Sequence, residues 1–586
     1  MTAAPDRVSF HFSVAAEHAA CLTGTADGGF AAELWTLRGP QADQVLSQVP
    51  VTPQAQPVPT DDGRLLILVN GTKRHRISLS DPHRPEGRVL SLNLSARGLR
   101  LVAAPSGAGL ALALETDHDD QTVLWRVLEK PLRAERALTL PGRTGRVHWL
   151  DLAGDRLAID LRQGPRVVTA LVDLRAGTWT PLPHPEGTDT HRVVLADPRS
   201  GRLLLATDRG GAPRLGWASA EEPTEPRLPR GLNSVRGAVL PLAFDPTGSR
   251  LALRVTRGAV AEAVRYDLAT DRISGTELPG GMVYPAACWG EGGLWVAHSR
   301  PGVPTRVERV SDQPRRTRPV PSGPGDPRVE RFGEGPDDFE AVCLGDWRRS
   351  EGVVVALHGG PEAAWTLGHD SLLDRLSRSG LAVVAPNQRG SLGYGQPHAR
   401  AIHGAWGGPD LADIRALVRQ LRAERASRAM APALYGISYG AFLGLLTVAA
   451  DPSSWSRCVA VAPFLSARRL YGTAGAQVRA LVDRHREGPH APTPTDEWGE
   501  RDLWRLSARI RTPLLLVHGA DDPTVPVDQS RQLRRRLTDL GRREGTDFDY
   551  VEVPDAGHDP LREPGGAALA DRVTDFLRAR TPAPTG

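Results

Sequence analysis

The pattern of hydrophobic and polar residues along the chain changes once, between about residues 312 and 329. Before this point, short apolar runs alternate with turns rich in Gly, Asp, Pro and Ser, and no helical period stands out. After it, apolar runs are separated by amphipathic segments long enough to form helices. The pattern therefore predicts an all-β domain followed by a domain in which strands and helices alternate.

A repeated unit accounts for the first part of the chain. Each copy has a turn, usually ending in Gly, followed closely by Leu and an apolar strand. Successive copies are spaced by 43 to 48 residues, close to the period of about 40 to 50 residues of a four-stranded propeller blade. The anchoring leucines are Leu22, in a degenerate copy, and Leu65, Leu110, Leu157, Leu203, Leu251 and Leu294.

Seven copies predict a seven-bladed β-propeller over residues 1–312. The second copy, around residues 56–85, is short enough to lack a strand. A pair of β-sandwiches would also give short strands and turns, but it has no reason to keep a spacing of about 45 residues through seven units. The next segment, residues 313–328, is rich in Pro, Gly and Arg and is expected to be a linker.

Residues 329–586 are expected to form a mainly parallel sheet wrapped by helices. In such sheets the chemistry lies beyond the carboxyl ends of the strands. The apolar runs that predict strands are 353–357, 381–386, 433–436, 458–463, 514–519 and 548–553, and helices are expected near 370–379, 409–425, 439–450, 527–540 and 564–579.

Composition and charge exclude several classes of protein. A chain of 586 residues is too long for one hydrophobic core, and 40% hydrophobic with 24% charged residues is typical of a folded globular protein. The net charge of +4 is too small to indicate a nucleic acid partner. Four scattered cysteines, Cys21, Cys288, Cys343 and Cys458, resemble neither a disulfide framework nor a metal site. Without a leader-like or membrane-spanning segment, we expect a soluble cytoplasmic protein that acts away from membranes.

A candidate nucleophile follows the run ALYG. The sequence Gly436-Ile437-Ser438-Tyr439-Gly440 precedes an apolar helix, and a strand, GxSxG and a helix together form the nucleophile elbow of α/β-hydrolases. GxSxG alone is weak, because a chain with 61 glycines can match it by chance as an ordinary Gly-rich turn. The strand and helix around this copy favour Ser438 as a nucleophile.

A serine nucleophile needs a base and an acid, which follow it in α/β-hydrolases in the order Ser, Asp, His. Asp522 lies after the run LLLVHG and His558 lies after FDYVEV, so both stand at strand ends. Asp521 is the rival for the acid, and the unused aspartate would cap turn amides. A histidine on a surface loop is the alternative for His558, weakened by the presence of the other two residues.

The developing oxyanion of an acyl transfer needs hydrogen-bond donors. The sequence HGGP at 358–361 follows the strand VVVAL, so the amides of Gly360 and Tyr439 are the expected donors. His358 is expected to be structural in that loop. This chemistry needs neither a metal ion nor a cofactor.

The assembled motifs resemble the prolyl oligopeptidase family over about residues 350–580. They are HGGP with Trp365, NQRGSLGYG (387–395), WGGPDLAD (406–413), GISYGA (436–441), TPLLLVHGADDPTVP (512–526) and DAGHD (555–559). The resemblance implies a propeller ahead of an α/β-hydrolase domain, the triad Ser438, Asp522 and His558, and an oxyanion hole at Gly360 and Tyr439. The resemblance also implies peptide hydrolysis through an acyl-enzyme. Within the family, the sequence looks nearest to acylaminoacyl-peptidases and bacterial dipeptidyl-peptidase-like members.

Two features depart from this family. Many of its peptidases carry Arg or Asn two residues after the catalytic Asp to hold a substrate carbonyl, and this chain has Thr524. The dipeptidyl branch binds the free N-terminus with paired glutamates, but the surroundings of Glu221-Glu222 do not match and favour a solvated loop. The segment 465–504 is expected to shape the acyl pocket.

The leading hypothesis is a serine peptidase of the prolyl oligopeptidase type that hydrolyses short peptides, with the propeller restricting substrate size. A second is a hydrolase or acyltransferase acting on a small amide, ester or thioester, including a specialised peptide product, which Thr524 keeps open. A third, a binding propeller with an inactive hydrolase domain, is disfavoured by the complete set of Ser438, Asp522 and His558. The partner is thus a short peptide or small acyl substrate.

Overall fold

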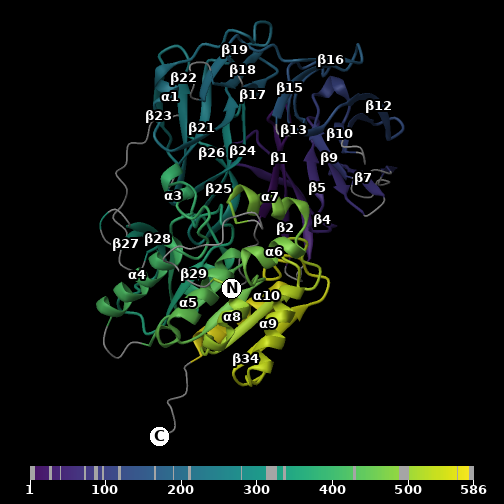
Figure 1. The fold of residues 1–586 in the computed structure, drawn as a ribbon. Helices are drawn as coiled ribbons and strands as arrows, with labels where there is room; N and C mark the ends of the chain where they lie inside the picture. Colours follow the sequence, from purple (N-terminus) through teal and green to yellow (C-terminus); the bar gives the residue numbers. More distant parts are fainter. Residues whose placement is uncertain are drawn as a thin grey trace. The chain divides into compact units, whose positions relative to one another are not determined.

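The chain forms two compact units, Met1–Val255 with Ala261–Thr317, and Thr256–Val260 with Arg318–Gly586, in the computed structural model (Figure 1). The described residues are 7–579 except 26–28, 40, 72–73, 85–89, 95–97, 117–120, 164–165, 189, 209–212, 279, 312–325, 334, 336–337, 426–429, 488–500 and 564. Most of the expected linker 313–328 therefore lies outside the described residues, and the domain boundaries there stay a prediction.

Unit 1 consists of short strands that pair with their neighbours in sequence, the strand pattern of a β-propeller. Among the described residues, four sheets hold four strands, one holds three, and one holds seven. In the last, β22 and β24 meet only through the parallel pair Ala261 and Met282.

The elements of unit 1 are β1 (Arg7–Phe12), β2 (His18–Gly24), β3 (Phe30–Thr36), β4 (Asp43–Val51), β5 (Gln56–Pro59), β6 (Leu65–Val69), β7 (His75–Ser80), β8 (Leu90–Leu94), β9 (Gly98–Ala103), β10 (Ala111–Thr116), β11 (Thr122–Leu128), β12 (Arg133–Leu140), β13 (Arg143–Trp149), β14 (Arg156–Gln163), β15 (Arg166–Asp173), β16 (Thr178–Pro181), β17 (His191–Asp197), β18 (Arg202–Thr207), β19 (Arg214–Ser219), α1 (Arg230–Asn233), β20 (Ala238–Phe244), β21 (Arg250–Arg257), β22 (Val260–Asp267), β23 (Arg272–Gly275), β24 (Met282–Gly290), β25 (Gly293–Arg300) and β26 (Val303–Val310).

The repeated leucines occupy equivalent places in these sheets. They lie in or directly before β2, β6, β10, β14, β18, β21 and β25, the second strands of successive groups, and none is more than 6% exposed. The repeat therefore marks a buried side chain on an inner strand. The expectation that the second copy lacks a strand is wrong, because β5, β6, β7 and β8 form a complete four-stranded sheet.

Apolar packing joins the first and last sheets of unit 1. Ala19 of β2 and the nearby Leu37 pack in one cluster with Cys288 of β24 and Trp295 of β25. Trp295 is fully buried there. Side-chain burial thus links the beginning and the end of this unit.

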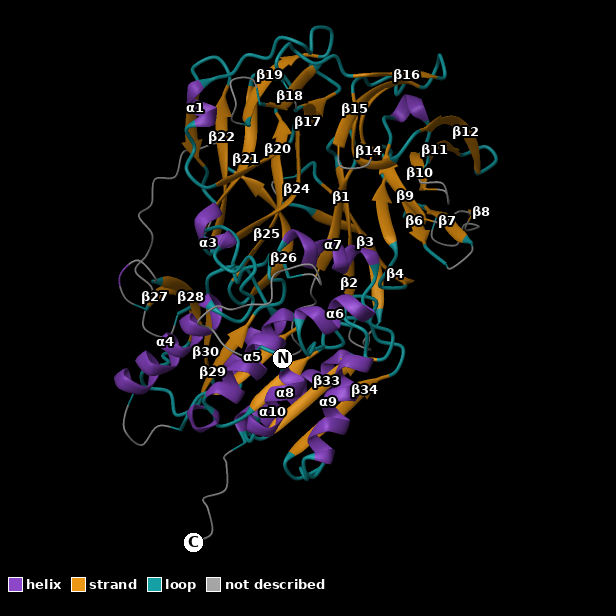
Figure 2. Ribbon diagram, in the orientation of Figure 1, coloured by secondary structure: helices purple, strands orange, loops and turns teal. Residues whose placement is uncertain are grey.

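Unit 2 is built on one twisted sheet of eight described strands in the order β27-β28-β30-β29-β31-β32-β33-β34 (Figure 2). The strands from β30 to β34 are parallel, and β28 pairs with β30 in the antiparallel direction. The mainly parallel sheet expected from the sequence is confirmed, with β27 and β28 added at one edge. The strands are β27 (Arg328–Phe332), β28 (Phe339–Leu344), β29 (Val353–Leu357), β30 (Ala382–Asn387), β31 (Ala433–Ile437), β32 (Cys458–Val461), β33 (Leu514–Gly519) and β34 (Phe548–Val553).

Helices cover both faces of this sheet (Figure 2). Alternate residues of β29 point to opposite faces, with Val355 in the cluster that contains α4 and α5 and Val354 in the cluster that contains α2 and α10. Burial on both faces explains why the strands are continuous apolar runs. The helices are α2 (Ser371–Arg378), α3 (Gln396–Arg400), α4 (Pro409–Glu424), α5 (Tyr439–Ala450), α6 (Ala467–Thr473), α7 (Ala476–Arg484), α8 (Leu503–Leu506), α9 (Asp528–Asp539) and α10 (Gly566–Arg578). No helix in the described part of the chain is long and apolar enough to cross a bilayer.

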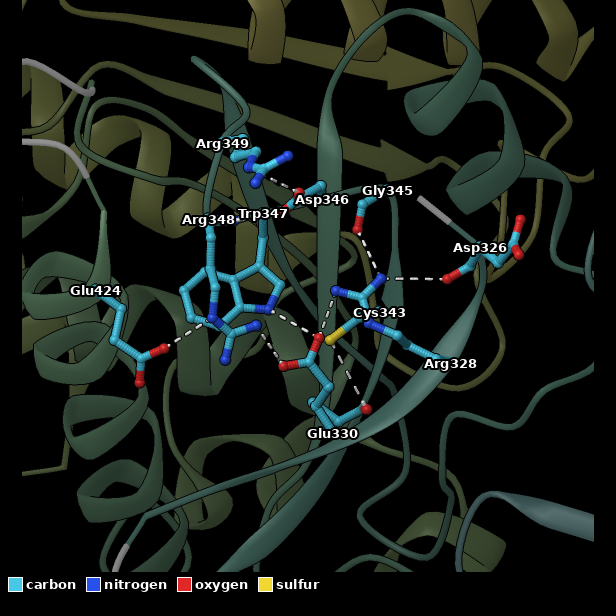
Figure 3. Close-up of polar contacts among 11 residues, drawn as sticks. Asp326, Arg328, Glu330, Cys343, Gly345, Asp346, Trp347, Arg348, Arg349 and Glu424 are labelled. Atoms are coloured by element: carbon cyan, nitrogen blue, oxygen red, sulfur yellow. Dashed lines mark hydrogen bonds and ion pairs between the residues drawn. The ribbon is translucent and has the colours of Figure 1, made fainter. Parts of the chain in front are cut away.

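A polar network holds the edge strand β27 (Figure 3). Glu330 accepts hydrogen bonds from Trp347 Nε1 at 3.2 Å and Arg348 Nη1 at 2.8 Å, and it pairs with Arg328 at 2.5 Å. Arg348 also stacks 4.0 Å from the centre of the Trp347 ring and pairs with Glu424 of α4 at 2.9 Å. Because Trp347 is fully buried, the network ties the edge of the sheet to its core.

We predict that Leu157→Ala destabilises unit 1 by about 2–5 kcal/mol, because it leaves a cavity at a fully buried position of β14. Leu152, in the turn before the same strand, is 50% exposed, so Leu152→Ala should change the stability by no more than about 0.5 kcal/mol. Urea unfolding followed by tryptophan fluorescence measures both. Equal losses for the two variants would contradict the role assigned to the repeated leucine.

Candidate active site

Ser438 lies on a sharp turn between β31 and α5. Its backbone has φ 56° and ψ −118°, a strained conformation for a residue with a side chain. A Cβ on Gly436 would lie 2.3 Å from Gly440 O, and one on Gly440 would lie 2.4 Å from Leu357 O. The turn therefore requires glycine at both places, which is the physical basis of the GxSxG pattern.

The structure brings Asp522 and His558 together on the loops after β33 and β34. His558 Nδ1 donates to Asp522 Oδ2 at 2.6 Å, and the carboxylate is fully buried while the imidazole is 28% exposed. Asp522 Oδ1 also accepts the amides of Thr524 and Val525 at 2.7 and 3.0 Å. Asp521 is exposed, and its amide donates to a carbonyl of the His558 loop. The geometry favours Asp522 over Asp521 as the partner of the base, and the turn-capping role also falls to Asp522.

A second histidine, His518 of β33, touches the same carboxylate and was missed by sequence reasoning. It is fully buried, its Nε2 lies 2.8 Å from Val525 O and 3.2 Å from Asp522 Oδ2, and its Nδ1 accepts from Ser530 Oγ at 2.7 Å. Burial would raise the pKa of Asp522, but the hydrogen bonds from His518, His558 and Val525 hold it well below its usual range. The carboxylate therefore stays ionised. The only sequence sign of His518 was a polar residue inside an apolar run.

The two expected oxyanion donors belong to different segments, the loop after β29 and the first turn of α5. Gly360 follows β29 and has φ 125°, and a Cβ on its neighbour Gly359 would lie 3.6 Å from Ser438 Cβ. Tyr439 is the first residue of α5, and the amides of a first helical turn have no acceptor within the helix. His358 is buried, with Nδ1 2.6 Å from Gly359 O and Nε2 2.8 Å from Ser391 Oγ, and burial lowers its pKa to about 4. The neutral, enclosed His358 ring therefore fixes the loop 358–361 through these two hydrogen bonds.

Buried groups around α5 fix the side chain of Tyr439. Its hydroxyl donates to Asp410 Oδ2 at 2.6 Å, and the Trp406 ring packs against it edge to face, with the ring centroids 5.2 Å apart. Burial raises the pKa of Asp410 to about 6, against the hydrogen bond from Tyr439. The motif WGGPDLAD thus supplies two residues that anchor the turn after Ser438.

Two further features were singled out in the sequence, the glutamate pair and the expected pocket segment. Glu221 and Glu222 are exposed in a turn of unit 1. The proposed pocket segment 465–504 contributes α6, α7 and α8, while residues 488–500 lie outside the described residues. Among the described residues, no group of three or more His, Cys, Asp or Glu is arranged to hold a metal ion.

Comparison with known proteins identifies the family of one part of the chain. Residues 370–581 match the prolyl oligopeptidase family. This part of the chain is a prolyl oligopeptidase family domain. The rat acylamino-acid-releasing enzyme is 27% identical to it over 208 residues, which cover 34% of this chain and 28% of the rat enzyme. The aligned region therefore spans less than a third of that relative.

Solved structures resemble both units. The acylaminoacyl peptidase of Pyrococcus horikoshii has a TM-score of 0.73 at 14% identity and covers 99% of this chain and 97% of its own. A puromycin-hydrolyzing peptidase of Mycobacterium tuberculosis has a TM-score of 0.69 at 18% identity, covering 97% and 94%. At these identities the likeness concerns the fold, a propeller combined with a prolyl oligopeptidase family hydrolase domain.

In this prolyl oligopeptidase domain, we predict that Asp522→Ala lowers kcat for an activated ester by about 10⁴-fold, because His558 loses the acceptor that fixes its tautomer. Asp521→Ala should stay within about threefold of wild type, since its side chain is exposed. Steady-state hydrolysis measures both variants. A larger loss for Asp521→Ala would show that the acid is misassigned.

Proposed function

We propose that this protein is a serine peptidase that hydrolyses short peptides through Ser438, His558 and Asp522. The observation that carries the proposal is the 2.6 Å hydrogen bond between the buried Asp522 carboxylate and the part-exposed His558. Both residues lie on loops at the carboxyl ends of the parallel strands, where the turn of Ser438 also lies. Family membership of residues 370–581 supports it independently.

In the proposed reaction, Ser438 Oγ attacks the substrate carbonyl and passes its proton to His558 Nε2, because Nδ1–H is committed to Asp522. The amides of Gly360 and Tyr439 stabilise the oxyanion. His558 then protonates the leaving amine, and an acyl-enzyme remains on Ser438. Water, activated by His558, hydrolyses this ester and restores the serine.

N-acylated short peptides are the substrate class that we favour. The rat relative is named an acylamino-acid-releasing enzyme and the archaeal structural neighbour an acylaminoacyl peptidase. We further propose that unit 1 is a seven-bladed propeller that restricts substrate size. The repeated leucines support seven blades, and so does the seven-stranded sheet, which divides at the single pair Ala261 and Met282 into β20–β23 and β24–β26.

A second candidate is hydrolysis or acyl transfer on a small amide, ester or thioester. Thr524 favours it, because this side chain offers at most one neutral hydroxyl where many relatives carry a guanidinium or amide group. A structural neighbour is named a puromycin-hydrolyzing peptidase. The same triad would serve both candidates.

We predict that Ser438→Ala abolishes turnover, with a loss on the order of 10⁶-fold, and leaves the fold intact. Alanine removes only the attacking oxygen and keeps the backbone of the elbow. Fluorophosphonate labelling and circular dichroism measure the two parts. Equal labelling of wild type and variant would mean that another residue is the nucleophile.

A substrate panel separates the two candidate functions. N-acylated dipeptides, free peptides, X-Pro peptides and simple esters are compared by kcat/KM, with Ser438→Ala as the blank. A peptidase should prefer the peptides and should process chains of some tens of residues while leaving folded proteins intact. Preference for small esters or amides would favour the second candidate, and cleavage of a folded protein would contradict the size limit.

Thr524→Arg should raise kcat/KM for N-acylated dipeptides by about ten- to a hundredfold, and for small esters much less. A guanidinium adds a charge-assisted hydrogen bond of about 1.5–3 kcal/mol to an extended peptide backbone. Thr524→Met is the control for side-chain length without charge. Equal loss of peptide and ester hydrolysis in both variants would mean that the position is structural.

A further inference from the structure

A buried histidine outside the triad connects two parts of the domain. His485 follows α7 and is 1% exposed. Its Nδ1 accepts a hydrogen bond from Trp406 Nε1 at 3.3 Å, and its Nε2 lies 3.1 Å from Glu362 Oε1. The proposed chemistry uses none of these side chains.

These contacts fix the tautomer of His485. An indole N–H only donates, so Nδ1 must be unprotonated, and the ring proton lies on Nε2, where it faces the Glu362 carboxylate. Burial lowers the pKa of His485, against the opposing effect of Glu362. The neutral ring therefore satisfies both partners at once, with one acceptor and one donor.

Each partner leads to one expected oxyanion donor. Glu362 lies two residues after Gly360, in a turn closed by the hydrogen bond from Ala363 N to Pro361 O at 2.8 Å. Trp406 packs edge to face against the ring of Tyr439. His485 thus stands between the loop after β29 and the residue that follows Ser438.

We propose that His485 is a positioning residue of the oxyanion hole, holding the loop of Gly360 in register with the turn of Tyr439 through Glu362 and Trp406. The proposal rests on the proposed function, because it assigns those two amides to the oxyanion. They come from loops after different strands, so only non-covalent contacts set their separation. A misplacement of about 1 Å is enough to weaken catalysis strongly.

Arg484 is the competing anchor of the same loop. It pairs with Glu362 at 2.9 and 3.2 Å, but its side chain is 55% exposed. Exposed ion pairs are weak and flexible, whereas the hydrogen bond from His485 starts from a buried ring and has a fixed direction. Arg484→Met is therefore the matched control.

The decisive measurement compares an ester with its thionoester, because a sulfur atom fits poorly in an oxyanion hole built for oxygen. His485→Phe keeps a planar ring and removes both hydrogen bonds. We expect kcat for the ester to fall about tenfold, less than the hundredfold or more lost when a donor is removed outright, with KM within about threefold. The ester-to-thionoester rate ratio should fall with it. His485→Gln, which can still donate to Glu362, should recover part of both losses, and Arg484→Met should change neither.

Further outcomes keep the test independent of folding and of the proposed function. If His485→Phe does not fold, Glu362→Ala cuts the same link at a side chain 42% exposed and should lower the same ratio. An unchanged ratio in the folded variants, or an equal loss in Arg484→Met, would overturn the role of His485. A wild-type protein that neither hydrolyses esters nor reacts with fluorophosphonate would instead overturn the proposed function.

Discussion

The strained turn at Ser438 depends on the burial of α5. Positive φ at a serine costs about 1–3 kcal/mol and persists only where the surroundings enforce it. The helix that follows is apolar on all sides, and every residue from Tyr439 to Ala449 is buried between the sheet and neighbouring helices. Any relaxation of the elbow would withdraw this helix from its contacts, so the core maintains the conformation that presents the hydroxyl.

Two buried carboxylates near this helix behave differently because their donors differ. Asp522 receives bonds from two histidines and two amides, and its pKa is held low despite burial. Asp410 receives a tyrosine hydroxyl and weaker amide contacts, with a second carboxylate, Asp413, nearby, and burial raises its pKa to about 6. Enough directed donors thus keep a buried carboxylate charged. The ionised Asp522 carboxylate can orient His558, while the Asp410 carboxyl anchors Tyr439.

The sequence predicted the features that depend on local pattern. Strands buried on both faces appear as apolar runs, so β29, β33 and β34 were located to the residue, and the repeated leucines mark inner strands of unit 1. Features set by contacts between distant segments were missed. The edge strand β27 is not an apolar run, because it alternates charged residues with Val329 and Phe332 and is held by its pairing with β28 and by ion pairs. The roles of His518 and Asp410 depend on partners that only the folded chain supplies.

The order of strands explains why the loop that carries His558 must pass over the end of β33. In the sheet, β32 lies between β31, which leads to Ser438, and β33, which leads to Asp522, so these two strands are roughly 10 Å apart. His558 follows the still more distant β34. The loop after β34 returns over the end of β33, where a Cβ on Gly519 would lie 2.0 Å from Gly557 O. Only glycine leaves room for this crossing. The hydrogen bond from Asp521 N to Ala556 O at 2.9 Å then holds the two loops together, so the residue beside Asp522 fixes the path of the loop that carries His558.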